Sequence, residues 1–453
     1  MMVILRTSLI TISIIITLLT IIIFSLLSYS ESSSDKASTD NRKQVFLTAI
    51  LEDQGDPNRW NSLLNRSIQE LNAKHPDLDI RINYTTYPYN ETREQLLRTM
   101  SDKIPVDLIT VDQIWLGEFA QKGLLTDLTN YSQRWDRASD WYEINWDGGA
   151  YNDRIYGIWA WADIRGMWYW KDLLQKADVD PNSLRTWDGY IAAAKKLNAV
   201  LRPEGIEGVH LVAASHSPDM SFYPYLWMNG GAIVEDRPGH PTKEQYWFPA
   251  YNGTEGVMAL QFIKDQIDAG IKPQKEHFWG KEFLDRKFAV MLEALQHHIP
   301  PPHTPENKRD FEQKVGFLPL FPTPDEDQSS ASLMGGWLLS IPATSEHKNL
   351  VWELIATILE PKILAPYLAA HANIPTQIPI GEGNYSIRAN TTIPYYNKLI
   401  SMIEIAHIRP SISEYPEISS HIKQAIDEVM YGIKEPKQAL DDAAAKSAKV
   451  LGW

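Results

Sequence analysis

Strand-like and helix-like segments alternate along the first quarter of the chain, and this alternation restricts the fold more than any other feature. Residues 45–51 form a short apolar run, and residues 58–74 follow with apolar side chains at helical spacing. The order then repeats with an alternating segment at 79–84, a helical segment at 93–100 and an apolar run at 106–111. Such an order is typical of a parallel sheet covered by helices, so the sequence predicts an α/β fold.

The length of the chain predicts two domains, because 453 residues are too many for one simple core. The second portion repeats the pattern of the first. We expect strands at 155–161, 288–292 and 315–319, and helices at 171–177 and 187–197.

The N-terminus places the protein relative to the membrane. Residues Leu9–Leu27 are apolar without interruption and are long enough to span a bilayer core of ~30 Å. Arg6 precedes this run and acidic residues follow it, which favours an orientation with the rest of the chain outside the cell. We therefore expect residues 1–29 to be a transmembrane anchor or a signal peptide, and residues 30–42 to be a flexible stalk.

Net charge and composition exclude several classes of function. The formal net charge of -14 opposes nucleic-acid binding, and the absence of cysteine excludes disulfides, thiolate metal sites and a cysteine nucleophile. His297, His298 and His303 lie near Glu293 but lack the helical spacing of metal ligands. No metal, cofactor or catalytic motif is predicted.

The segment 156–170 reads YGIWAWADIRGMWYW and places tryptophans on both sides of Asp163. A carboxylate accepts hydrogen bonds from hydroxyl groups, while indole rings cover the apolar face of a sugar ring. Trp161 and Asp163 therefore fit a saccharide site. Aromatic runs are also common in protein cores, and both interpretations stay open for this segment.

Two further motifs have the same chemistry. Asp112 ends the apolar run 106–111 and is followed by Trp115, so it either caps a helix or contacts a ligand at the carboxyl edge of the sheet. Gly335, Gly336 and Trp337 combine close backbone approach with a stacking face, although a tight turn beside a core tryptophan gives the same pattern.

Five blocks of this sequence, in order, resemble the extracellular solute-binding proteins of ABC sugar importers, the family that includes maltose- and trehalose-binding proteins. The blocks are VDLITVDQIWLGEFAQKGLLTDLT, YGIWAWADIRGMWYWKDLLQKA, YPYLWMNGGAIV, SLMGGWLLSIP and HIRPSISEYPEIS. The resemblance covers the chain from about Val45 to its end. It implies two α/β lobes of the periplasmic-binding-protein type (class II), no enzymatic activity, and capture of a saccharide for delivery to an ABC permease.

The resemblance also implies lobe boundaries and ligand contacts. Lobe 1 is expected at 43–157 plus 337–365, and lobe 2 at 158–336 plus 366–453. The first crossing between the lobes is expected within 156–161. The residues expected to contact the ligand are Glu52, Asp56, Asp112, Trp115, Trp161, Asp163, Gln296, Gly335, Gly336, Trp337 and Arg409.

Two alternative functions remain open at this stage. Acidic charge and aromatic side chains also suit a polyamine or another small organic solute, since cations bind to aromatic faces. The pair Asp112 and Asp163 also suits a glycoside-processing enzyme, which needs two carboxylates. In the preferred interpretation the protein is a monomer on the outer face of the cell membrane, attached by Leu9–Leu27 unless this segment is cleaved.

Overall fold

The computed structural model describes residues 42–212, 218–238, 247–274 and 280–453. The expected anchor at 1–29 and nearly all of the expected stalk lie outside the described residues. None of the helices formed by the described residues is both long and apolar enough to cross a membrane. Contacts divide the chain into a small unit, Met1–Gln44 with Pro76–Asp79, and a large unit, Val45–His75 with Ile80–Trp453, which contains every residue of the candidate site.

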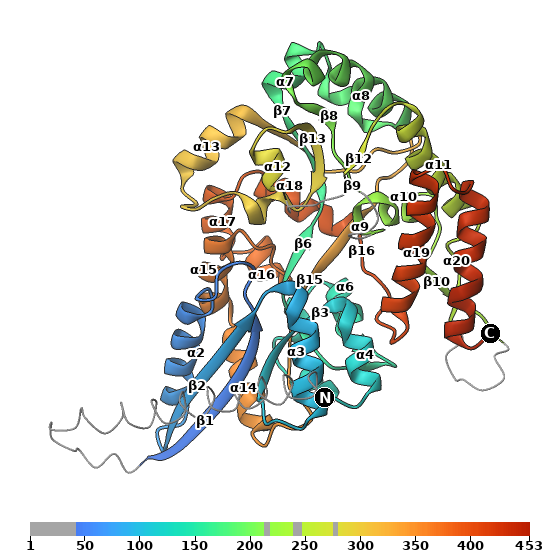
Figure 1. The fold of residues 1–453 in the computed structure, drawn as a ribbon. Helices are drawn as coiled ribbons and strands as arrows, with labels where there is room; N and C mark the ends of the chain where they lie inside the picture. Colours follow the sequence, from blue (N-terminus) through green and yellow to red (C-terminus); the bar gives the residue numbers. More distant parts are fainter. Residues whose placement is uncertain (1–41, 213–217, 239–246, 275–279) are drawn as a thin grey trace, which may run out of the picture. The chain divides into compact units, whose positions relative to one another are not determined.

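The larger sheet of the described residues has the strand order β16-β15-β3-β1-β2, and β6 also pairs with β15 (Figure 1). Its strands are β1 (Lys43–Glu52), β2 (Leu78–Tyr87), β3 (Leu108–Asp112), β6 (Ile158–Ile164), β15 (Ser332–Ser340) and β16 (Ala406–His407). Strand β1 runs parallel to β3, whereas β15 runs antiparallel to both β3 and β6. The expected parallel α/β arrangement is thus present, with one strand from late in the chain inserted antiparallel.

Helices cover this sheet, and the longer ones among them bury an apolar face. The helices connecting or following its strands are α2 (Asn61–Lys74), α3 (Tyr89–Ser101), α4 (Leu116–Gln121), α5 (Thr129–Gln133), α6 (Glu143–Gly148), α14 (Lys348–Ile358) and α15 (Pro361–His371). In α2 the buried side chains include Leu63, Leu64 and Leu71, which recur at helical spacing. This burial explains why α2 packs against α14 and α15.

The second sheet has the order β14-β7-β13-β8. Its strands are β7 (Gly166–Trp170), β8 (Glu207–Val209), β13 (Phe288–Glu293) and β14 (Val315–Leu318). All six residues of β13 are buried, as expected for a strand with neighbours on both sides and helices on its faces. The helices of this portion are α7 (Lys171–Lys176), α8 (Trp187–Leu201), α9 (Pro218–Ser221), α10 (Tyr223–Met228), α11 (Thr254–Asp268), α12 (Lys281–Leu284) and α13 (Pro305–Lys314).

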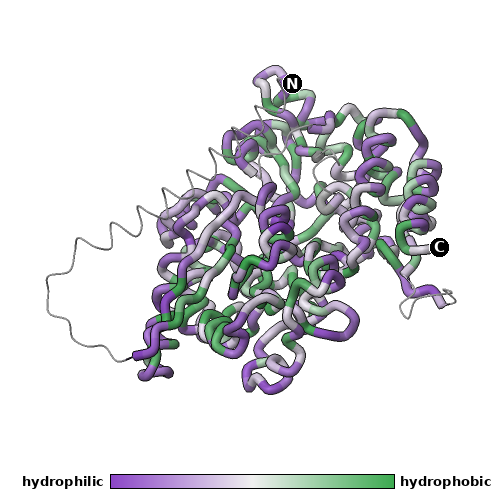
Figure 2. The backbone as a smooth tube through the Cα atoms, turned by 60° about the horizontal axis from the view of Figure 1, so that its bottom comes forward, coloured by the Kyte–Doolittle hydropathy of each residue, from purple (hydrophilic) through white to green (hydrophobic). Residues whose placement is uncertain are grey.

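The C-terminal part of the chain is mostly helical, as the sequence predicts. Its helices are α16 (Ile378–Gly381), α17 (Ile387–Thr392), α18 (Tyr396–Ser401), α19 (Tyr415–Met430) and α20 (Pro436–Leu451). Helices α19 and α20 lie side by side, and the hydropathy colouring of Figure 2 shows apolar and polar segments alternating along the chain in this region.

The two sheets are joined directly at Arg165. Strand β6 pairs with β15 in the larger sheet, and β7 begins one residue later and pairs with β13 and β14 in the second sheet. The tryptophan-rich segment 156–170 therefore belongs to both sheets. Trp168 and Trp170 are buried beside Phe317 and Phe283, in the core of the second sheet.

Candidate functional site

Strand register brings the main sequence candidates onto one face of the larger sheet. Trp337 lies directly opposite Asp112 on β3 and opposite Trp161 on β6. Gly335, two residues earlier on β15, lies opposite Asp163. Directly opposed residues in antiparallel strands share a face of the sheet, and residues two apart on one strand do too. These five positions, which are far apart in the sequence, are therefore neighbours on one face.

An aromatic cluster lies next to Asp112. Trp115 and Trp337 meet edge to face with ring centroids 5.6 Å apart, and Tyr89 lies 5.5 Å from Trp115 and 6.1 Å from Trp337. Both tryptophans are buried, whereas Tyr89 is 46% exposed. The ring of Tyr89 is thus the part of this cluster that solvent or a ligand reaches most easily.

Asp112 has partners from three elements. Its carboxylate accepts a hydrogen bond of 2.8 Å from the Tyr89 hydroxyl and one of 3.4 Å from the backbone N–H of Ile114, so it also caps the short 3-10 helix Gln113–Trp115. Arg409 Nη2 lies 3.8 Å from its Oδ1. Burial raises the pKa of Asp112 above its ordinary value, although Arg409 and Tyr89 oppose this shift. The two interpretations of Asp112, cap and site residue, are therefore compatible.

The pKa of Asp163 is shifted in the opposite direction. Burial alone would raise its pKa, but the guanidinium groups of Arg165 and Arg409 outweigh burial, so the pKa lies below its ordinary value. Arg165 Nη2 donates to Asp163 Oδ2 at 3.3 Å, and Arg165 Nε lies 3.9 Å from Glu293 Oε1. Asp163 Oδ1 is buried and has no hydrogen-bond partner among the described residues. The Asp163 side chain as a whole is 28% exposed, so its carboxylate is an incompletely satisfied acceptor at an accessible position.

The glycines of β15 make this arrangement possible. A Cβ atom on Gly335 would overlap Asp163 Oδ1 and would lie 3.1 Å from Arg409 Nη2. Gly336 has a φ of +145° and passes close to the backbone of β6, where the pairing register shifts. The two glycines are thus explained by close packing within the protein.

A second polar cluster is centred on Arg59, just before α2. Its guanidinium donates to the Tyr367 hydroxyl at 2.8 Å, to Asn373 Oδ1 at 3.0 Å and to the side chain of Gln54. Glu52, which is 1% exposed, lies 3.7 Å from Arg59 Nη1. Burial raises the pKa of Glu52 to about 7, although Arg59 opposes the shift. Residues more than 300 positions apart in the sequence therefore meet here.

The Arg59 cluster extends to the second sheet. Asn373 Nδ2 lies 3.3 Å from His297 Nδ1, and Gln296 Nε2 lies 3.3 Å from the other ring nitrogen of His297 and 3.5 Å from the Ile164 carbonyl. Burial lowers the pKa of His297 to about 3, so its ring is neutral at physiological pH. Gln296 is fully buried, and its Oε1 has no hydrogen-bond partner among the described residues.

Two of the residues predicted to contact the ligand lie in other surroundings, one buried and one in an exposed loop. Trp161 is 1% exposed and is enclosed by Trp60 at 5.2 Å, Tyr367 at 5.7 Å and the Arg59 guanidinium at 5.4 Å, so its ring is occupied by protein groups. Asp56 is exposed in the loop before α2, where it accepts a hydrogen bond from the backbone of Asn58.

Sequence reasoning missed Tyr89, Arg59, Arg165 and Asn373. Arg165 lies within the tryptophan-rich segment, two residues after Asp163. Its position so close to a predicted site residue could have indicated that it belongs to the site. The other three have no local motif. In the part of the chain that the structure describes, no three His, Asp or Glu side chains are grouped so that they would hold a metal ion.

Comparison with known proteins agrees with this architecture. The chain is similar to the arabinooligosaccharide-binding protein of Bacillus subtilis, with 25% identity over 64% of each chain. Its fold is similar to that of an ABC transporter solute-binding protein from Thermotoga lettingae solved with α-D-tagatose (TM-score 0.73, 21% identity, 90% of this chain and 100% of the other). It is also similar to that of the cyclic α-maltosyl-1,6-maltose binding protein from Arthrobacter globiformis (TM-score 0.73, 23% identity, 90% and 99%).

These similarities show a two-lobed α/β fold of the periplasmic-binding-protein type, and they agree with the fold expected from the five sequence blocks. Residues 55–364, more than half of the chain, match the family described as bacterial extracellular solute-binding protein. The chain belongs to the family of bacterial extracellular solute-binding proteins.

Proposed function

We propose that this protein captures an uncharged saccharide at the face formed by Asp112, Asp163 and Trp337, and delivers it to the permease of an ABC transporter. The observation that carries the proposal is the combination of a buried, unsatisfied carboxylate oxygen on Asp163 with an aromatic cluster on the same face of the sheet. A carboxylate accepts hydrogen bonds from sugar hydroxyls, and aromatic rings cover the apolar faces of the sugar.

The balance of charge favours a neutral ligand. Each carboxylate near the site has an arginine partner: Arg409 lies beside Asp112, and Arg165 lies beside Asp163 and Glu293. A polyamine would have to approach these guanidinium groups, whose repulsion is strong in a partly buried setting. Hydroxyl groups accept from arginine and donate to carboxylate, so a saccharide matches both kinds of partner.

The pairing of these carboxylates with arginines also argues against a glycosidase. Such an enzyme needs one carboxylic acid that is protonated and placed to donate to the leaving oxygen. Asp163 is held ionised by Arg165 and Arg409. Burial raises the pKa of Asp112, but its carboxylate accepts hydrogen bonds from Tyr89 and Ile114 rather than donating one. These carboxylates are suited to holding hydroxyls rather than to transferring protons.

The ligand is expected to stabilise a closed form of the protein. We propose lobe 1 at 43–157 plus 337–365 and lobe 2 at 158–336 plus 366–453. A ligand that contacts both lobes shifts the opening equilibrium by its differential affinity for the closed form. The closed monomer then docks on the permease. We further propose that Leu9–Leu27 anchors it at the outer face of the membrane unless cleaved.

Titration calorimetry tests this function on the full chain, kept in a detergent without a sugar headgroup. The ligands are maltose, trehalose, short glucans, arabino-oligosaccharides and spermidine. We expect one of the saccharides to bind, and Asp163→Asn to weaken it by about 10- to 150-fold, because hydrogen bonds to charged groups contribute ~1.5–3 kcal/mol. Glu326→Gln, which removes an exposed carboxylate elsewhere, is the matched control.

Three results would contradict the proposal. Spermidine binding in preference to every saccharide would indicate the polyamine function. Shortened saccharides recovered after incubation would indicate an enzyme. Equal affinity of wild type and Asp163→Asn would show that the ligand binds elsewhere.

A further inference from the structure

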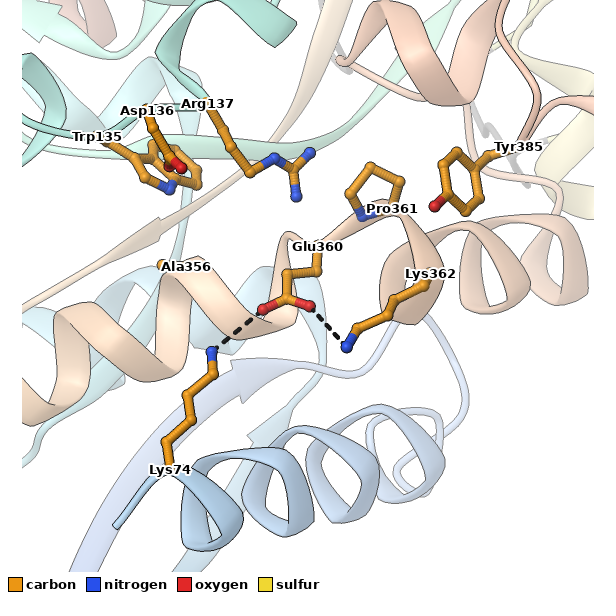
Figure 3. Close-up of a pocket in the computed structure, with 9 residues that line it drawn as sticks. All are labelled: Lys74, Trp135, Asp136, Arg137, Ala356, Glu360, Pro361, Lys362 and Tyr385. Carbon is orange, nitrogen blue, oxygen red and sulfur yellow. Dashed lines mark hydrogen bonds and ion pairs between the residues drawn. The ribbon is translucent and has the colours of Figure 1, made fainter.

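A cavity of about 430 Å³ lies apart from the candidate site. It is bordered by the end of α2, the junction between α14 and α15, the loop before the 3-10 helix Ala138–Asp140, and the segment between α16 and α17 (Figure 3). None of its lining residues belongs to the site described above. Its volume falls within the range of small-molecule sites in proteins.

Salt bridges hold the polar groups of this cavity in place. Glu360 bridges two lysines, with Lys74 Nζ 3.2 Å from one carboxylate oxygen and Lys362 Nζ 3.2 Å from the other (Figure 3). Arg137 donates to Asp140 at 2.6 Å and to Gln377 at 3.2 Å. These polar groups are thus positioned before any ligand arrives, which lowers the entropic cost of binding.

Two aromatic residues line the same cavity. Trp135 is partly exposed and is fixed by contacts with Trp141 at 4.7 Å and Trp352 at 5.4 Å. Tyr385 is 45% exposed, and neither its ring nor its hydroxyl has a partner among the described residues. An exposed, unpartnered aromatic ring at the edge of a polar cavity marks a surface that is available for contact.

The charges around the cavity define the kind of ligand. Every cation has a carboxylate partner, since Glu360 serves Lys74 and Lys362 while Asp140 serves Arg137. Lys362 also lies 3.4 Å from Glu70, and the exposed Asp136 adds a further negative charge. No excess of positive charge is left to attract an anion. A neutral ligand with many hydroxyls satisfies both the donors and the acceptors, and its C–H faces suit the aromatic rings.

We propose that this cavity is a second binding site, separate from the candidate site, for a neutral saccharide or polyol. Tyr385 and Trp135 contact the apolar faces of the ligand. Glu360, Arg137 and the two lysines bond to its hydroxyls.

Fluorine NMR of the full chain tests the second site, with 5-fluorotryptophan in place of tryptophan and in the same detergent. The Trp135→Phe variant assigns the Trp135 resonance, and Trp337→Phe assigns that of the candidate site. We expect maltose or L-arabinose to shift the Trp135 resonance with saturation. Tyr385→Ala should weaken this response by about two- to tenfold, given ~0.5–1.5 kcal/mol for an aromatic contact. Tyr431→Ala, at an equally exposed tyrosine outside the cavity, should leave it unchanged.

The outcomes separate this proposal from the proposed function. Asp163→Asn should raise the sugar concentration that saturates the response of Trp337 by about 10- to 150-fold while leaving that of Trp135 intact. The second site is rejected if neither sugar shifts Trp135, if Tyr385→Ala responds as wild type does, or if inorganic phosphate or spermidine shifts Trp135 more than the sugars do. The fluorine resonance of Trp337 reports on the candidate site, so its response to a sugar does not depend on any of these results.

Discussion

Gly335 and Asp163 face each other across β15 and β6, and only glycine at position 335 leaves room for the Asp163 carboxylate. A Cβ atom there would overlap Asp163 Oδ1 and would come within 3.1 Å of Arg409 Nη2. The residue that we propose as the acceptor for the ligand is thus positioned by a neighbour without a side chain. This relationship gives a direct test of the site.

Gly335→Ala should displace the Asp163 carboxylate and weaken ligand binding by about tenfold or more, since the substitution inserts a methyl group into a packed contact. The free energy of unfolding should fall by about 1–3 kcal/mol. Calorimetry and urea unfolding measure the two effects. Gly335→Ala combined with Asp163→Ala should recover stability relative to Gly335→Ala alone, because the clash is removed. Unchanged binding by the single variant would contradict the assigned geometry.

Tyr89→Phe tests the hydrogen bond of 2.8 Å to Asp112. Loss of this bond should raise the pKa of Asp112 further, since Tyr89 stabilises the ionised carboxylate. Ligand affinity at neutral pH should fall by about threefold to tenfold, with little change in stability, because Tyr89 is half exposed. Tyr84→Phe, which removes a 2.7 Å hydrogen bond to Asn61 on the surface, should bind as wild type does. An equal loss in both variants would count against a specific role for Tyr89.

Glu52→Gln tests the buried carboxyl group beside Arg59. An unfolded glutamate ionises near pH 4.5, whereas in the fold the pKa is raised to about 7. Between these values the folded chain keeps a proton that the unfolded chain releases, so the group lowers stability as pH rises. Glu52→Gln should therefore exceed wild type in unfolding free energy by up to about 3 kcal/mol at about pH 8, and by far less at about pH 5.

Urea unfolding at both pH values measures this difference. Asp56→Asn is the matched control, because it removes an exposed carboxylate from the loop that follows β1. Its difference from wild type should stay within about 0.5 kcal/mol at each pH. A Glu52→Gln effect that is the same at about pH 5 and about pH 8 would show that Glu52 titrates normally in the fold.

Arg59→Leu tests the cluster in which Arg59 contacts Tyr367 and Asn373. The variant leaves Tyr367 and Asn373 without their donor and leaves Glu52 buried without a cation. Breaking a buried pair in this way should cost about 3–5 kcal/mol at about pH 8. The loss should be smaller at about pH 5, where Glu52 is protonated. Arg134→Leu, at an exposed arginine, should be nearly neutral, and similar losses in the two variants would disprove the role of Arg59.

The expected strands and helices agree with the structure wherever the pattern was periodic. The helix predicted at 58–74 is observed as Asn61–Lys74, and the strand predicted at 106–111 is observed as Leu108–Asp112. The strand expected at 155–161 is observed as Ile158–Ile164, and the connection between the sheets follows at Arg165. Trp161 shows the limit of this approach, because a tryptophan beside an aspartate has the same sequence signature in a core as in a ligand site.

The sequence alone determined the α/β class, the carboxylate at the end of β3 and the glycine–glycine–tryptophan motif, because periodicity and strand ends are local properties. It also carried the family resemblance that the comparison confirmed. Only the tertiary structure decided that Arg409 meets Asp112, that Arg59 meets Tyr367 and Asn373, and that Gly335 faces Asp163. These partners lie far apart in the chain. Their contacts depend on strand register and on packing between sheets, and no local pattern encodes either.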